Sequence, residues 1–145
     1  MTTISTIGFT KKTLQEFITA LRQANVQRVI DVRLRNTSQL AGWSKYPDFA
    51  YLLVEGFGIE YEHHPEFAPT GELLDGYKKD HDWPRYEEAF NALLAARNPE
   101  VEGRALLARE GICLLCTEPT PEKCHRRLVA EYLVGLMPEA EIKHL

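Results

Sequence analysis

The fold of this chain is decided by the stretch Gly111-Ile112-Cys113-Leu114-Leu115-Cys116, which is the most apolar run in the sequence. A continuous apolar run of this length is typical of a strand that is buried on both faces of a sheet. A loop rich in Pro and Thr follows, and then an amphipathic segment from Pro121 to Leu136. The stretch therefore predicts a buried strand, a loop and a helix, which together form the repeating unit of α/β proteins.

The same alternation runs through the rest of the chain. The segments 3–8, 26–32 and 59–63 predict three more strands, and 141–144 predicts a short terminal strand. Helical periodicity predicts helices over about 13–21, 47–55, 83–94, 99–109 and 121–136. We therefore expect a single three-layer α/β domain over residues 1–145, with a mostly parallel sheet of about five strands and helices on both faces.

The composition argues against several classes of protein. Of the 145 residues, 44% are hydrophobic, and 17 Lys and Arg stand against 21 Asp and Glu, so the formal net charge is −4. This balance argues against a broad nucleic-acid-binding surface but is compatible with a small basic pocket. No apolar run is long enough to span a membrane, and the three cysteines are too few and odd in number for a disulfide framework. We expect a cytoplasmic protein with reduced thiols; the sequence indicates neither a cofactor nor an oligomeric state.

Polar side chains follow four of the predicted strands, at the point where each strand ends. These are Thr10 after the first strand, Asp31 and Arg33 after the second, His63 and His64 after the third, and Cys116 and Glu118 after the fourth. The carboxyl ends of parallel strands lie at one edge of a sheet, where open α/β folds bind ligands. The sequence therefore predicts one shared crevice.

The segment from Cys116 to Arg127 combines thiol, carboxylate, imidazole and guanidinium groups. We interpret Cys116 as a nucleophilic or redox thiol, His125 as its base and Glu118 as an acid or an orienting group. At Cys124, in the first turns of the predicted helix, the helix dipole and the nearby Arg126 favour the thiolate. Cys124 points toward the sheet by its helical spacing and is a possible further site residue.

The segment that begins at Asp31 indicates a binding loop. Arg33 lies just beyond a strand and, with Arg126, is suited to clamp a phosphate or carboxylate, while Asp31 can orient Arg33 or act as a base. The alternative is an Asp–Arg pair that braces the edge of the sheet. Further along the loop, Asn36 and Gln39 are candidate binding residues. The possible additional site residues are Trp43, Thr10, His63 and His64.

Several other chemistries compete for these residues. A phosphatase loop requires an arginine six positions after its cysteine, but Glu122 stands six positions after Cys116; a rhodanese-like loop is excluded for a similar reason. A metal site of Cys116, Cys124 and His125 is a second alternative, although adjacent residues diverge on a helix, so both can be ligands only in irregular backbone. We assign no metal ligand from the sequence.

Together these motifs resemble a prokaryotic family, domain-of-unknown-function family 488. The resemblance rests on Thr6-Ile7-Gly8-Phe9-Thr10, Asp31-Val32-Arg33, Thr37-Ser38-Gln39-Leu40-Ala41-Gly42, Ile59-Glu60-Tyr61, Pro65-Glu66 and Cys116-x-Glu118-(x5)-Cys124-His125-Arg126. Many members carry a proline and a Ser-Arg pair after Asp-Val-Arg, where this chain has Asn36 and Ser38-Gln39. The resemblance implies an α/β fold with a polar cleft and brings no established reaction.

Two functions of different class follow from these observations. The leading hypothesis is a small enzyme that uses Cys116, Glu118 and His125 on a small anionic or nucleotide-like substrate bound by Arg33, Asp31, Asn36, Gln39 and Arg126. The alternative is a non-catalytic module that binds a nucleotide or a nucleic-acid end, with structural cysteines.

Overall fold

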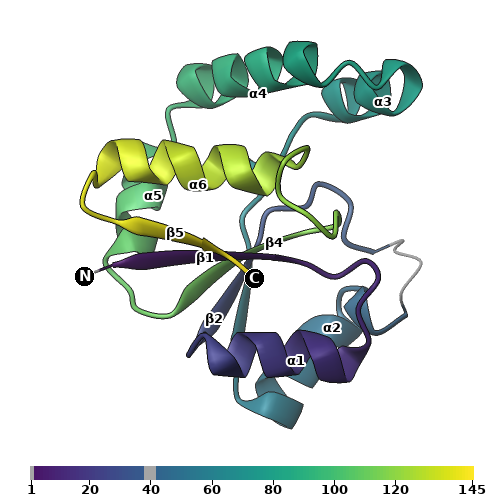
Figure 1. Ribbon diagram of the computed structural model, residues 1–145, viewed down its shortest axis with the longest axis vertical. Coiled ribbons are helices and arrows are strands. Elements are labelled where there is room, and N and C mark those ends of the chain that lie inside the picture. The colour runs from purple at the N-terminus through teal and green to yellow at the C-terminus, as the bar shows by residue number, and fades with distance from the viewer. Residues whose placement is uncertain (1, 38–41) are drawn as a thin grey trace.

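The computed structural model describes residues 2–37 and 42–145 and contains a parallel sheet with helices on both faces (Figure 1). Its strands are β1 (Thr3–Gly8), β2 (Arg28–Asp31), β3 (Glu60–His63), β4 (Ile112–Cys116) and β5 (Glu141–His144). Their order in the sheet is β3-β2-β4-β1-β5, and every neighbouring pair is parallel. The predicted α/β fold with a five-stranded parallel sheet is confirmed.

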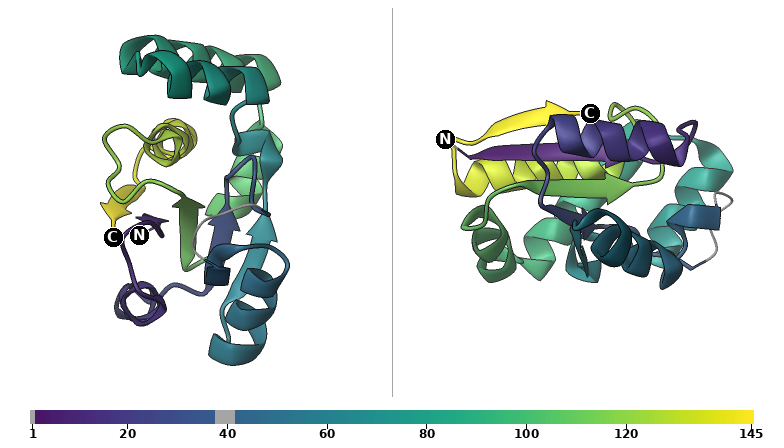
Figure 2. Two further views of the ribbon diagram at one scale, coloured as in Figure 1. Left: turned by 90° about the vertical axis from the view of Figure 1, so that its right-hand side faces the viewer. Right: turned by 90° about the horizontal axis from the view of Figure 1, so that it is seen from below.

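The helices lie on the two faces of the sheet in two groups (Figures 1 and 2). One face is covered by α1 (Leu14–Gln23) and by α2 (Asp48–Tyr51) with the π-helical turn Leu52–Gly56. The other face is covered by α5 (Glu100–Leu107) and α6 (His125–Leu136). Outside α6 lie α3 (Gly71–Asp80) and α4 (Trp83–Arg97), which form an additional layer.

The topology explains this division of the helices. The connections from β1 to β2 and from β2 to β3 move across the sheet in one direction, whereas those from β3 to β4 and from β4 to β5 move in the other. Right-handed crossovers that move in opposite directions must pass over opposite faces. The chain therefore leaves β1 and β2 toward one face and leaves β4, which lies between them, toward the other. Such a switch point opens a crevice at the carboxyl end of β4.

The apolar run in β4 is buried on both sides of the sheet. Cys113 and Leu115 belong to the hydrophobic core beneath α1 and α2, whereas Leu114 and Cys116 belong to the core beneath α5 and α6. Successive side chains of a strand point to opposite faces, so a central strand of a doubly covered sheet requires apolar residues at every position. As a consequence, the thiols of Cys113 and Cys116 lie in different cores.

Local sequence signals place most helix starts correctly. Thr13 forms a capping box with Glu16, and the Asp82 side chain caps α4. The last helix, expected from Pro121, begins only at His125 because Cys124 is its N-cap, with extended backbone angles (φ −140°, ψ 137°). This difference decides the geometry of the site.

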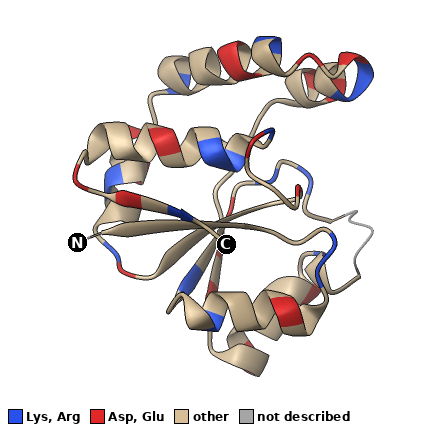
Figure 3. Cartoon of the chain, viewed as in Figure 1, with Lys and Arg blue, Asp and Glu red and all other residues tan. Residues whose placement is uncertain are grey.

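Charged segments are interspersed along the helices and strand ends in the view of Figure 3, and the middle of the sheet carries few of them. None of the helices in the described part of the chain is long and apolar enough to cross a membrane.

Candidate functional site

A cavity of about 210 Å³ lies at the carboxyl end of β4. Its walls come from the end of β4, the start of α6, the segment after β2, and α3 with the start of α4. Among the residues that line it are five of the predicted site residues: Arg33, Cys116, Glu118, Cys124 and His125. Segments far apart in the sequence thus meet at the edge of the sheet where the polar residues were expected.

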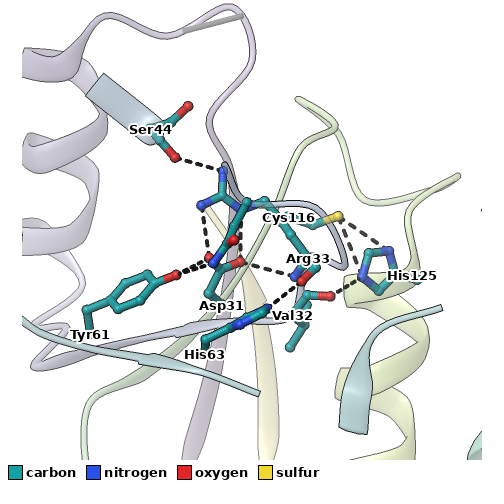
Figure 4. A network of polar contacts seen from close by, with 9 residues as sticks. Asp31, Val32, Arg33, Ser44, Tyr61, His63, Cys116 and His125 are labelled. Carbon is teal, nitrogen blue, oxygen red and sulfur yellow. Dashed lines mark hydrogen bonds and ion pairs between the residues drawn. The ribbon is translucent and has the colours of Figure 1, made fainter. Parts of the chain in front are cut away.

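Cys116 and His125 form a thiol–imidazole pair in this cavity (Figure 4). The Sγ atom of Cys116 lies 3.4 Å from Nδ1 of His125, and both residues are buried. The other ring nitrogen, Nε2, lies 2.7 Å from the main-chain carbonyl oxygen of Val32. Because a carbonyl oxygen only accepts hydrogen bonds, Nε2 carries a proton and donates it to Val32. In the neutral ring, Nδ1 is then the nitrogen without a proton, and the sulfur lies closer to it than to Nε2, which is 3.8 Å away.

The surroundings shift the pKa values of the two thiols at this end of the sheet in opposite directions. Burial raises the pKa of Cys116, but the hydrogen bond with Cys124, the backbone N–H of Thr117 and the charge of Arg126 lower it, and the net shift is downward. Burial, the hydrogen bond with Cys116 and the charge of Cys116 raise the pKa of Cys124 well above its usual value. Burial likewise raises the pKa of Cys113. Cys116 is therefore the thiol that ionises most readily.

Cys116, Cys124 and His125 also bring three potential metal-ligand atoms together. One such atom from each residue lies within 4.8 Å of the other two. Adjacent residues can converge here because Cys124 is extended, whereas His125 is the first residue of α6. This is the irregular backbone that a metal site at these positions requires. Within residues 2–37 and 42–145, no fourth His, Cys, Asp or Glu joins the group.

Arg126 is completely buried behind the thiols and is absent from the cavity wall. Its Nε donates to Oγ1 of Thr6 at 3.2 Å, and its Nη1 donates to the carbonyl oxygen of Glu118 at 2.5 Å. No carboxylate pairs with it among the described residues, and its Nη2 has no hydrogen-bond partner there. A buried cation without a counter-ion favours an anion nearby, so Arg126 supports a thiolate at Cys116.

The side chain of Glu118 is exposed, and the contact that the structure gives Glu118 in this region is made by its backbone carbonyl. That carbonyl lies against Gly8, where a Cβ atom would be only 1.6 Å away from the oxygen. The group that orients His125 is the carbonyl of Val32. The structure does not bring the Glu118 carboxylate to the imidazole.

Arg33 and Asp31 form a buried ion pair. Nε and Nη2 of Arg33 donate to the two carboxylate oxygens at 2.8 and 2.9 Å, and Nη1 donates to the carbonyl oxygen of Ser44 at 3.0 Å. Asp31 also accepts the hydroxyl of Tyr61, which in turn accepts a bond of 3.1 Å from Asn36. This is the bracing arrangement that the sequence left as the alternative to an anion clamp.

The remaining predicted residues lie around this pair or away from the cavity. His63 donates from Nε2 to the carbonyl oxygen of Arg33 at 2.7 Å, and His64 contacts the carboxylates of Glu62 and Glu66. The Trp43 ring packs against Phe9, Phe17 and Phe49 instead of covering the site. Thr10 contributes a backbone hydrogen bond to Thr117. Gln39 lies outside the described residues.

The outer wall of the cavity was not predicted from the sequence. Three aromatic side chains stand there, Tyr77, Trp83 and Tyr86, with ring centroids 5.1 to 5.6 Å apart. Lys78 and Lys123 also line the cavity and are exposed. Aromatic residues at both ends of the connection between α3 and α4 were the available signal, but packing onto α6 is what brings them over Cys116.

Comparison with known proteins gives one match. The family model described as "Domain of unknown function DUF488" matches residues 13–133, which include every wall of the cavity. No curated protein and no solved structure matches the chain significantly.

Proposed function

Because this chain belongs to the DUF488 family, whose description names no reaction, we propose its function from its own site: it is a small thiol enzyme, in which Cys116 is the nucleophile and His125 the base. The observation that carries this proposal is the 3.4 Å contact between Sγ and an imidazole nitrogen that the Val32 carbonyl leaves unprotonated. A nucleophile, a base and a group that orients the base are the parts that covalent catalysis needs. Three reduced thiols suit a cytoplasmic location.

The cavity wall supports a small anionic or nucleotide-like substrate. Tyr77, Trp83 and Tyr86 provide apolar ring surface, and Lys78 and Lys123 provide positive charge at the rim. Aromatic faces stack on nucleobases, and ammonium groups attract phosphate. In this proposal Arg126 stabilises the thiolate from behind, while Asp31, Arg33, Asn36 and Tyr61 hold the floor of the site in place.

The nucleophile can be tested by alkylation with iodoacetamide across a pH series. Trypsin separates residues 110–123, which contain Cys113 and Cys116, from residues 124–126, which contain Cys124. Because the pKa of Cys116 is lowered, we expect its labelling rate to reach half of its maximum below about pH 8.5, the free-thiol value. His125→Gln retains a donor for Val32 but lacks the base, and it should slow labelling at neutral pH about tenfold or more.

Cys113 is the internal control, because it is buried in the other core and should remain unlabelled. A half-maximum at or above about pH 8.5 that does not respond to His125→Gln would remove the nucleophile from the proposal.

The same assay examines the second candidate function, a metal centre, which is favoured by the convergence of three ligand atoms. If zinc occupies the site, Cys116 and Cys124 resist labelling until a chelator is added, whereas Cys113 remains unlabelled throughout. The unpaired charge of Arg126 works against a second cation and makes the thiolate the preferred interpretation.

Substrate class can be examined by thermal shift with nucleoside monophosphates. A ligand present at 100 times its Kd stabilises the folded state by about 2.7 kcal/mol, which raises the Tm by roughly 5 to 10 °C for a chain of this size. We expect this shift in wild type and in Cys116→Ser, and a smaller one in Lys123→Gln. Lys143→Gln is the matched control, because Lys143 is exposed on β5 outside the cavity.

This measurement also distinguishes an enzyme from a binding module. Binding by both wild type and Cys116→Ser, with turnover by wild type only, supports the enzyme. Binding without turnover by either protein supports the non-catalytic module. An equal loss of binding in Lys123→Gln and Lys143→Gln would contradict the proposed role of the cavity rim.

A further inference from the structure

Cys124 is a second thiol of the cavity that the proposed reaction does not use. Its sulfur lies within 4.8 Å of the Cys116 sulfur. Both side chains are buried, and both line the same cavity. A reactive thiol with a second thiol beside it is the arrangement from which protein disulfides form on oxidation.

The backbone at Cys124 permits the two sulfur atoms to approach each other. A disulfide requires a separation of about 2.05 Å, so the sulfur atoms must move closer than they are in the reduced protein. Cys124 is the extended N-cap residue of α6, and the regular helix begins at His125. The residues between the two cysteines form a loop without regular secondary structure. The Cys124 side chain and this loop, which must supply the movement, both precede the first turn of α6.

The two thiols have different surroundings. Cys116 has an imidazole nitrogen 3.4 Å from its sulfur, which can accept the thiol proton. The structure records no such contact for Cys124 among the described residues. Cys116 is therefore the thiol that attacks an oxidant first, and Cys124 is placed to attack the oxidised Cys116.

We propose that Cys116 and Cys124 form a reversible disulfide on reaction with a hydroperoxide, with Cys116 as the peroxide-reactive thiol and Cys124 as the resolving thiol. This inference rests on the proposed function only in that Cys116 is the nucleophile. The cavity of about 210 Å³, which both cysteines line, has room for a small hydroperoxide. The disulfide blocks the nucleophile until a thiol reductant restores it.

The reaction balances in two steps. The Cys116 thiolate attacks the hydrogen-bearing oxygen of the hydroperoxide, the O–O bond breaks, and an alcohol (or water, from hydrogen peroxide) leaves with the proton that His125 accepted. This step oxidises Cys116 to sulfenic acid and reduces the peroxide by two electrons. The Cys124 sulfur then attacks the Cys116 sulfur, the S–O bond breaks, and water leaves with the Cys124 proton. Two external thiols reduce the disulfide through a mixed disulfide and are themselves oxidised to one disulfide.

The test is treatment of the full chain with a small excess of hydrogen peroxide, followed by tryptic peptide mapping without reduction. We expect residues 110–123 and 124–126 to appear as one cross-linked peptide, with fragmentation placing the bond at Cys116 and leaving Cys113 reduced. Dithiothreitol should return both peptides to the free form. In Cys124→Ser, oxidation should stop at sulfenic acid on Cys116, which dimedone captures. In Cys116→Ser, Cys124 should remain reduced at the same peroxide concentration.

The wild-type measurement alone can overturn the proposal, so it does not depend on how well the variants fold. Dimedone capture at Cys116 without any cross-linked peptide would show that Cys124 does not resolve the sulfenic acid, and the nucleophile would stand. A failure of both thiols to oxidise would also overturn it, and the alkylation series would then decide separately whether Cys116 is the nucleophile. A cross-link that involves Cys113 would contradict the assignment of the pair.

Discussion

Replacement of Asp31 by asparagine is expected to lower the free energy of unfolding by about 3 to 5 kcal/mol. Asp31 is completely buried, and Arg33 is only 2% exposed. Asparagine has nearly the same shape but no charge, and its amide group would point two donors toward a guanidinium group that also only donates. The Arg33 charge would remain in the protein interior without a counter-ion. The hydroxyl of Tyr61 would lose its charged acceptor as well.

Denaturant unfolding of Asp31→Asn, monitored by circular dichroism, measures this loss. Glu100→Gln is the matched control, because Glu100 pairs with Arg104 at 3.0 Å on the surface of α5, where both side chains are about half exposed. Exposed pairs of this kind contribute at most about 0.5 kcal/mol. Equal effects of the two substitutions would contradict the structural role of the Asp31–Arg33 pair. Loss of ligand binding at unchanged stability would instead return Asp31 to the substrate-binding group.

Replacement of Gly8 by alanine is expected to lower the free energy of unfolding by about 2 to 4 kcal/mol, since overpacking and the loss of a buried hydrogen bond act together. The new Cβ atom would lie 1.6 Å from the carbonyl oxygen of Glu118 and 2.9 Å from Nη1 of Arg126. The Glu118 oxygen belongs to the backbone, so the loop after β4 must move away from β1. This movement breaks the hydrogen bond from Arg126 to that oxygen.

The effect of Gly8→Ala should extend to the site. With its anchor displaced, Arg126 acts less strongly on the Cys116 thiol, so the half-maximum of alkylation should move to higher pH than in wild type. Gly135→Ala is the control: Gly135 lies in α6, and nothing lies within 4 Å of the added carbon. There the substitution should stabilise the helix by about 0.5 to 1 kcal/mol. A Gly8→Ala protein as stable as wild type, with unchanged alkylation, would contradict the proposed contact.

The sequence predicted those features that depend on neighbouring residues or on a periodic pattern of residue types. The apolar run that ends at Cys116 predicted a central strand, and the alternation of strands and helices predicted the parallel sheet, because burial on two faces requires apolar side chains at every position. Thr13 and Asp82 marked helix starts, since their side chains cap the first turn of a helix by hydrogen bonds over three residues. The parallel sheet in turn placed the polar residues after each strand at one edge.

The roles within the site were harder to predict because they depend on contacts across long separations. The group that orients His125 is a backbone carbonyl 93 residues away in the chain, and every residue has such a carbonyl, so no side-chain pattern indicates it. Glu118 was the carboxylate nearest to Cys116 in the sequence, but its side chain is exposed. Cys124 and His125 diverge on a regular helix and converge here because Cys124 precedes the first turn.

By itself the sequence determined the fold class and the edge of the sheet at which the polar residues gather, because strand burial, helix periodicity and strand polarity follow from the order of residue types. Only the tertiary structure decided which groups contact one another there. It buried Arg126 without a counter-ion behind the thiols, directed Arg33 to Asp31, and brought the aromatic side chains of α3 and α4 over the cavity. The physical reason is that a charge or a thiol takes its reactivity from its neighbours in space, and packing between distant segments decides what those neighbours are.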